Sequence, residues 1–206
     1  MVLKVNPNRM VLLQIKKRNN IAKRGHKLLK DKLDELMKHF LAIIKEIKEK
    51  REKAELLLEK AYNLMTISRG ILPTAKLREI IDSSKAEIEI GMEEKSILNV
   101  SVPSYSLEVK GDLYGYDFLL SPQVFDDAVQ SSFDAFKELV ELAEIERKAE
   151  LLANEIERTR RRVNALEYIL IPQLEEAVRY ITMKLDEMDR ESRVRLMKIK
   201  EMLEAI

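Results

Sequence analysis

The chain has 206 residues, of which 35% are charged and 46% hydrophobic, with only 5 Gly, 5 Pro and no Cys or Trp. This composition favours long helices or coiled coils over a compact enzyme domain, and the absence of Cys excludes disulfides, thiolate metal sites and a Cys nucleophile. No run of about 18 apolar residues exists and the first residues lack a signal-peptide core, so we expect a cytoplasmic protein without direct membrane insertion.

The formal net charge of +1 hides a pattern along the chain. Residues 1–30 contain nine Lys and Arg and no acidic residue, whereas residues 123–157 contain three basic and ten acidic residues. Two more basic ends therefore flank an acidic middle. If the two ends fold together, this distribution places a basic region where it can attract an acidic partner.

A long helix is the first element that the sequence predicts. From Leu12 to Leu64, alternating steps of three and four residues reach sixteen positions, and all but Asn19, His26 and Lys50 are apolar. Such a sustained 3.5-residue repeat predicts a supercoiled helix with one seam facing a partner helix. Asn6 is expected to cap this helix, with Pro7 at its first position. Residues 9–65 would span roughly 85 Å, and the N-terminal coiled-coil helix is assigned to residues 1–70.

Residues 71–122 are predicted to form a small α+β head. A short helix is expected at 74–83, after the break at Gly70–Pro73. Apolar and polar residues then alternate over 86–92 and 98–102, which predicts a β-hairpin at about 86–103 with its turn at Glu93–Ser96 and its end at Pro103. Residues 104–121 are expected to form an irregular loop.

A second long helix is predicted from about Pro122 to the C-terminus, within residues 123–206. Its apolar repeat runs from Leu142 to Leu170, slips by one residue near Pro172 and resumes at Val178. A local bend or change of supercoil is expected at the proline. The predicted fold class is therefore mainly α: a long antiparallel two-helix coiled coil with a small central head, forming one elongated structural unit.

The sequence offers no catalytic or metal site. His26 and His39 are separated by thirteen residues on one helix, about 20 Å apart, so they cannot share a metal ion. We expect His26 to fix the register of the seam. No phosphate-binding loop or nucleophile motif is present. Four acid–base pairs have the spacing of solvated helix pairs: Asp34/Lys38, Glu46/Lys50, Glu49/Lys53 and Glu144/Lys148. We therefore expect no catalytic residue, no cofactor and no metal.

The surface of the N-terminal helix carries an unusual pattern. Six apolar residues lie outside the seam: Leu13, Ile21, Leu28, Met37, Leu41 and Ile44. A stalk in water would not keep this apolar material, which favours a shaft surrounded by other protein over a wide core with a solvated basic face. Gly25, inside this helix, is expected to mark a close backbone approach or a bend.

Two classes of function fit a stalk with basic regions. One is a coiled-coil arm that binds nucleic acid through phosphate contacts, and the other is a mechanical coiled coil or assembly scaffold inside a protein complex. The basic residues are not interleaved with aromatic ones and residues 123–157 are acidic, which disfavours nucleic acid.

Two segments resemble a known family. They are NPNRMVLLQIKKRNNIAKRGHKLLKDKLDELMKHF at 6–40 and ERTRRRVNALEYILIPQLEEAVRYI at 157–181. They contain the runs Arg24–Lys32 and Arg161–Glu167, which closely resemble hallmarks of the D subunit of vacuolar/archaeal-type rotary ATPases. The similarity covers essentially the whole chain and is weakest over 66–122. Asn8 stands where that family usually has Thr, and both residue types can cap a helix.

The resemblance implies a central rotor shaft that couples ATP hydrolysis or synthesis to proton or sodium translocation. Its expected partners are the catalytic and regulatory nucleotide-binding subunits of a hexamer, a small central-stalk subunit and a socket subunit above the membrane ring. The chain itself would be non-catalytic, would bind neither nucleotide nor nucleic acid, and would be peripheral to the membrane through the complex.

Residues on the two helices are predicted to contact these partners. Apolar side chains near both chain ends suit a sliding bearing, because apolar contacts are non-directional, and the basic side chains suit acidic loops of the hexamer. The predicted contact residues are Met10, Leu13, Lys16, Lys23, Lys27, Lys30, Arg160, Arg161, Arg162, Met202 and Ile206.

Overall fold

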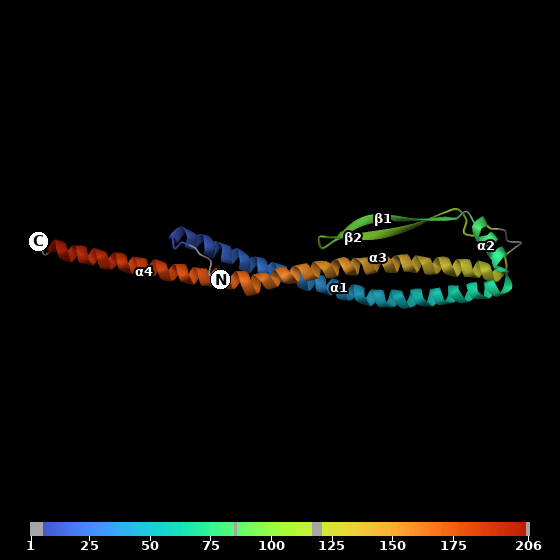
Figure 1. The fold of residues 1–206 in the computed structure, drawn as a ribbon, viewed down its shortest axis with the longest axis horizontal. Helices are drawn as coiled ribbons and strands as arrows, with labels where there is room; N and C mark the ends of the chain where they lie inside the picture. Colours follow the sequence, from blue (N-terminus) through green and yellow to red (C-terminus); the bar gives the residue numbers. More distant parts are fainter. Residues whose placement is uncertain (1–5, 85, 117–120, 205–206) are drawn as a thin grey trace. The chain divides into compact units, whose positions relative to one another are not determined.

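The computed structural model describes residues 6–84, 86–116 and 121–204 (Figure 1). Its elements, in chain order, are α1 (Arg9–Ile71), α2 (Thr74–Ser83), β1 (Glu87–Ile97), β2 (Val100–Lys110), α3 (Gln123–Ala165), the π-helix η1 (Leu166–Leu170) and α4 (Ile171–Glu204). The prediction of a mainly α fold with two long helical arms and a central hairpin is confirmed, and α2 matches the short helix expected at 74–83.

The chain forms two compact units. Unit 1 comprises Met1–Glu35 and Ile156–Ile206, and unit 2 comprises Leu36–Glu155. Helix α1 contributes to both units, while the hairpin and α2 belong to unit 2. The division into segments 1–70, 71–122 and 123–206 stays a prediction.

The seam predicted for α1 lies against its partner helix within each unit. None of the sixteen seam positions from Leu12 to Leu64 is exposed, and Ala22, Leu36, Ala54 and Ala61 are fully buried. In unit 1 the opposing buried residues include Val163, Leu174 and Ile181, and in unit 2 they include Leu142, Ile145 and Leu152. The apolar stripe of each helix is therefore buried against the other, as a two-helix coiled coil requires.

The start of α1 differs from the prediction. The helix begins at Arg9, and the side chain of Asn8 accepts a hydrogen bond from the Met10 N–H at 3.3 Å. Asn8 also accepts the Leu12 N–H at its backbone carbonyl, at 3.0 Å. The expected cap Asn6 and first residue Pro7 thus precede the helix, because Asn8 supplies the capping oxygen two residues later.

The hairpin is longer than predicted and turns at a different place. Strands β1 and β2 pair antiparallel from Glu87↔Lys110 to Ile97↔Val100, so Leu98 and Asn99 form a two-residue turn. Both have positive φ angles, 51° and 66°, as a type I′ turn requires. The turn expected at Glu93–Ser96 is therefore wrong, and part of the loop expected at 104–121 belongs to β2.

Pro103 lies inside β2 instead of ending it. The N–H of Tyr105, two residues further along, donates to Glu144 of α3 at 2.7 Å, so this edge of β2 faces away from β1. Pro103 has its nitrogen on the same edge, where no hydrogen bond to β1 is needed. Val102 and Pro103 are both buried, which places this part of the hairpin against α3.

A small apolar cluster joins α2 to the start of α3 in unit 2. It contains Leu77, Ile80, Tyr116 and Phe125, with the Tyr116 and Phe125 rings edge to face at 5.3 Å. The Tyr116 hydroxyl donates to Asp126 at 2.6 Å. Burial, and to a smaller extent this hydrogen bond, raises the pKa of Tyr116 above its usual range. None of the described helices is long and apolar enough to cross a membrane.

Candidate partner-binding surfaces

Two ion pairs and one histidine–carboxylate contact show how the helices of unit 1 run past each other. Arg9 lies 3.1 Å from Asp189, Lys23 lies 2.6 Å from Glu175, and His26 lies 3.3 Å from Glu167. The order of these pairs makes α1 antiparallel to the second arm, which consists of α3, η1 and α4. Because α1 begins at Arg9, the segment of α4 beyond Asp189 has no facing residue of α1.

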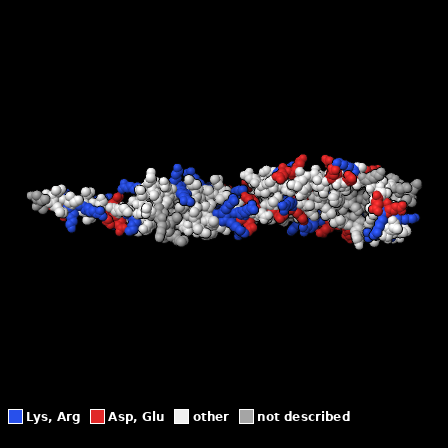
Figure 2. Space-filling view, turned by 45° about the horizontal axis from the view of Figure 1, so that its top comes forward, with Lys and Arg blue, Asp and Glu red and all other residues white. Residues whose placement is uncertain are grey.

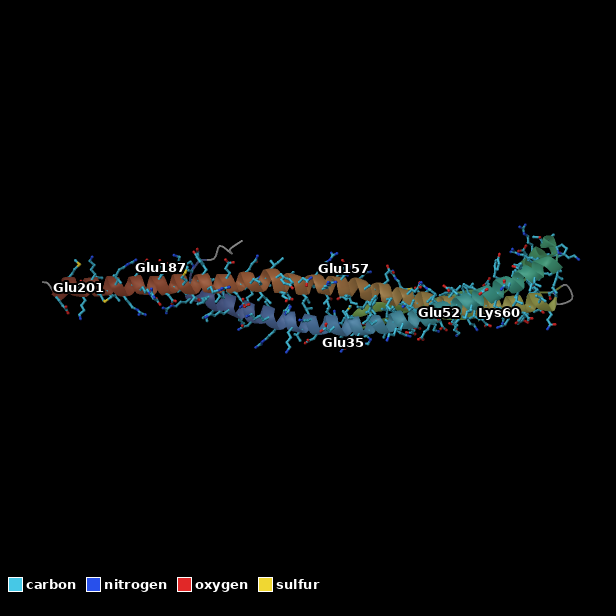
Figure 3. All side chains as sticks on the ribbon, turned by 90° about the horizontal axis from the view of Figure 1, so that it is seen from below. Glu35, Glu52, Lys60, Glu157, Glu187 and Glu201 are labelled. Carbon is cyan, nitrogen blue, oxygen red and sulfur yellow. The ribbon has the colours of Figure 1, made fainter. Side chains whose placement is uncertain are left out.

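This terminal segment of α4, Arg190–Glu204, is exposed at every position. Its apolar side chains include Leu196, Ile199 and Leu203, which are 63%, 53% and 69% exposed. Figure 3 shows the labelled Glu201 on a stretch of α4 with no helix of the unit beside it. A lone amphipathic helix in water buries nothing, so this segment is a surface that needs a partner.

The apolar residues predicted for a sliding bearing fall at two levels. Met10 and Leu13 lie near the start of α1, level with the Asp189 region, and both are exposed. Met202 is also exposed, but it lies thirteen residues beyond Asp189, about 20 Å further along α4 at the helical rise. Ile206 falls outside the described residues. The structure therefore does not bring Met10 and Met202 together.

The side of α1 that faces away from the seam is also apolar. At helical spacing it carries Met10, Leu13, Ile21 and Leu28, interrupted by Lys17 and Arg24. We call these six residues the outer stripe. The four apolar members are 61–69% exposed, so the core of unit 1 does not extend to this side. Of the other residues predicted to lie outside the seam, Met37 and Leu41 are exposed and Ile44 is half-buried.

All seven basic residues predicted to contact partners are exposed in unit 1, and two of them already have partners. Lys23 pairs with Glu175 and lowers the pKa of that carboxyl, while Arg161 pairs with Glu157 of the same helix. Within the described ranges, the other five form no ion pair: Lys16, Lys27, Lys30, Arg160 and Arg162. Figure 2 shows Lys and Arg side chains standing on the surface, where an acidic partner can reach them.

Ion pairs between helices in unit 2 were not foreseen from the sequence. Lys50 pairs with Glu141 and lies 3.5 Å from Glu138, and Lys53 also pairs with Glu138. The Lys53 bond and the nearby Lys50 lower the pKa of Glu138. The i,i+4 spacing predicts pairs of Lys50 with Glu46 and of Lys53 with Glu49, whereas the structure pairs both lysines with carboxylates of α3. The acid-rich composition of 123–157 is the sequence signal for this pairing.

Glu144 links the hairpin to α3. It accepts the Tyr105 N–H, and it pairs with Lys148 as the i,i+4 spacing predicted. Burial raises the pKa of Glu144, but the hydrogen bonds from Lys148 and from the Tyr105 N–H lower it further than burial raises it. The negative charge of α3 is thus used to hold the hairpin and α1 in place.

The described residues contain no group of three or more His, Asp and Glu side chains arranged to hold a metal ion. His26, half-buried in the seam, approaches Glu167, whereas His39 is exposed. Gly25 has open space around it, because an added Cβ would meet nothing within 4 Å. Packing inside this chain therefore does not require glycine at that position.

Comparisons with known proteins cover nearly the whole chain. A family described as the D subunit of ATP synthase matches residues 11–201. A protein of Acetivibrio thermocellus, named as the D subunit of a V-type ATP synthase, is 44% identical, covering 98% of this chain and 93% of its own length. Proteins of the same name are 45% identical in Thermoanaerobacter sp. strain X514, over 98% of both chains, and 43% identical in Clostridium botulinum strain Langeland, over 99% and 97%.

Proposed function

The chain belongs to the ATP synthase D-subunit family, whose members are central-stalk subunits of V/A-type ATPases, and we propose that it acts as the rotor shaft. In this role unit 1 turns inside the hexamer of catalytic and regulatory nucleotide-binding subunits. Rotation links ATP hydrolysis or synthesis in the hexamer to proton or sodium movement in the membrane sector. The chain supplies no catalytic group and binds no nucleotide.

The observation that carries this proposal is the double-sided apolar character of α1 in unit 1. Its seam is covered by the second arm, yet its outer stripe is 61–69% exposed at the apolar positions. The exposed segment Arg190–Glu204 adds apolar surface on α4. A surrounding protein would cover both, since apolar patches of this kind mark interaction sites.

Rotation requires contacts that change with angle, and the surface of unit 1 is suited to this. The outer stripe presents apolar residues with Lys17 and Arg24, while Arg160–Arg162 form a basic cluster on α3. Three otherwise equivalent catalytic subunits would meet different parts of this surface. Each angle would then favour a different state at each nucleotide site, and by linkage each site would favour a different angle.

Unit 2 would bind the remaining partners. The proposed partners are the small central-stalk subunit and the socket subunit above the membrane ring. Hairpin residues Ile90 and Met92 are 52% and 63% exposed, which leaves apolar surface for such contacts. Nucleic acid is the competing partner for the basic residues. The co-purification described next discriminates between nucleic acid and the hexamer.

Co-purification with a V/A-type catalytic hexamer from the same source tests the proposal. We expect one copy of the chain to be retained per hexamer of six subunits, with a changed ATPase rate. Absence of capture, together with retention of RNA that weakens steeply with salt, would instead favour the nucleic-acid arm.

A charge-neutralised variant makes the test specific. Replacing Arg160, Arg161 and Arg162 by Gln is expected to weaken hexamer binding at least tenfold, because charge-assisted contacts to acidic loops are lost. The matched control replaces three exposed basic residues of unit 2: Arg69, Lys76 and Arg78. The control variant is expected to bind the hexamer as the parent does. Equal affinity of both variants and the parent would contradict a role of the arginine cluster.

A further inference from the structure

The second arm of unit 1 changes its backbone hydrogen bonding at η1. Over Leu166–Leu170 the helix is a π-helix, and the N–H of Ile171 bonds to the carbonyl of Leu166, five residues back. The next residue, Pro172, has no N–H, so a further backbone hydrogen bond is missing. Single π-turns and prolines are recognised causes of helix bending.

Side chains are also poorly buried over the same stretch. Val163 and Leu174 are 8% and 2% exposed, but no residue between them is buried. Tyr168 and Ile169 of η1 are 71% and 57% exposed. Few buried contacts and weakened backbone bonds are the properties of segments that open locally.

The facing part of α1 is weakened as well. His26 contacts Glu167 of η1 at 3.3 Å, which places Gly25 and His26 level with the π-helix. Glycine lowers helix stability relative to alanine, and no neighbour within 4 Å accounts for its presence at position 25. Both helices of unit 1 are therefore locally less stable at the level of η1.

We propose that η1 and the facing Gly25–His26 segment form a twisting joint inside unit 1. The joint lets α4, together with the start of α1, turn relative to the end of α3 while the seams on both sides stay packed. This inference rests on the proposed rotor function only for its use: a joint at this level absorbs a difference in angle between the two ends of unit 1 during rotation.

Hydrogen exchange on the full-length chain tests the joint without the complex. Amides of residues 166–174 are expected to exchange at least tenfold faster than amides of residues 146–154. Deleting Ile169 removes the extra residue of the π-turn and restores the alternating steps of three and four along the seam. In this variant the two stretches are expected to exchange within about threefold of each other, as regular packed helices do.

Two further variants keep the test decisive. Ile169→Ala retains the chain length and the π-turn, so its exchange is expected to stay fast. If the deletion variant does not fold, Pro172→Ala combined with Gly25→Ala is expected to slow exchange at 166–174 at least threefold. Equal exchange of residues 166–174 and 146–154 in the parent chain would overturn the joint. So would exchange at 166–174 that is as fast in the deletion variant, or in the double variant, as in the parent.

The assembled ATPase then reports on its use. This test uses a Gly25→Ala variant that also lacks Ile169. Where the deletion does not fold, Gly25→Ala combined with Pro172→Ala replaces it. The variant is expected to bind the hexamer as the parent does. The number of ions transported against a gradient per ATP hydrolysed is then expected to fall at least twofold. An unchanged ratio would contradict a role in coupling. Failure of the parent chain to bind the hexamer would refute the rotor proposal and leave the exchange result to decide the joint.

Discussion

At the scale of single residues, Gly25 shows how an unfavourable residue can lack a reason inside its own chain. Its position in α1 is regular and open, so Gly25→Ala is expected to raise the free energy of unfolding of the isolated chain by about 0.5–1 kcal/mol. Urea denaturation measures the difference.

A second glycine provides the matched control. A Cβ at Gly91 would lie 2.4 Å from the Ser106 Oγ, so Gly91→Ala forces that side chain to move. This variant is expected to gain no stability. A loss of stability in Gly25→Ala would show that an unrecognised contact requires glycine there.

The carboxylates of Glu138 and Glu144 make stability depend on pH. Both have a pKa below the ordinary value of 4.5, because each is bonded to lysine in the fold. The stability that these carboxylates contribute to the fold is present above their unfolded-state pKa. It is lost as the pH falls through their lower pKa in the folded state. We expect the melting temperature to drop between about pH 5 and pH 3.

Replacing one carboxylate isolates its share of this effect. Glu144→Gln is expected to cost about 1–3 kcal/mol at pH 7, since the partly buried Tyr105 N–H loses a charged acceptor, and to flatten the acid transition. Glu176→Gln, an exposed site on α4, is the control and should leave both unchanged. An acid transition as steep as in the parent would contradict the assignment to Glu144.

At the scale of elements, the hairpin separates what alternation can and cannot predict. Alternating residues indicated two strands, but the polar run Glu93–Ser96 resembles a turn more than Leu98–Asn99 does. The turn position is set by register, which depends on docking of Val102 and Tyr105 against α3. Such tertiary contacts are not encoded in the local pattern.

The turn therefore contains a correctable strain. Leu98 has a φ of 51°, which costs a residue with a Cβ about 1 kcal/mol relative to glycine. Leu98→Gly is expected to slow amide exchange across β1 and β2 several-fold, and Ser96→Gly, inside β1, is expected to speed it. The opposite pair of results would place the turn at Glu93–Ser96.

Heptad counting was informative for the seams and limited for the sites. It identified sixteen positions of α1 of which none is exposed, and it located the one-residue slip that the π-helix accommodates. The slip lies beside Pro172, so heptad counting indicated a bend at the proline and not the π-turn that inserts one residue. Nor did it show that Met10 and Met202 lie at different levels, since that depends on where α1 begins.

At the scale of the whole molecule, stability and partner binding are separable in α4. Every residue of Arg190–Glu204 is exposed and faces no residue of α1, so this segment contributes little to the fold. Ending the chain after Arg190 is expected to shift the melting temperature by less than about 2 °C, because almost no apolar surface is uncovered. Ending it after Leu170 serves as the contrasting control, since it removes Leu174, Ala177 and Ile181 from the core and should destabilise unit 1.

The same truncation should act strongly in the complex. If Arg190–Glu204 is enclosed by the hexamer, its removal is expected to weaken binding of the chain to the hexamer at least tenfold, through loss of its apolar contacts. Titration of the truncated and parent chains against the hexamer measures this. A truncated chain that melts normally and binds with the parent's affinity would leave the outer stripe of α1 as the surface that the hexamer holds.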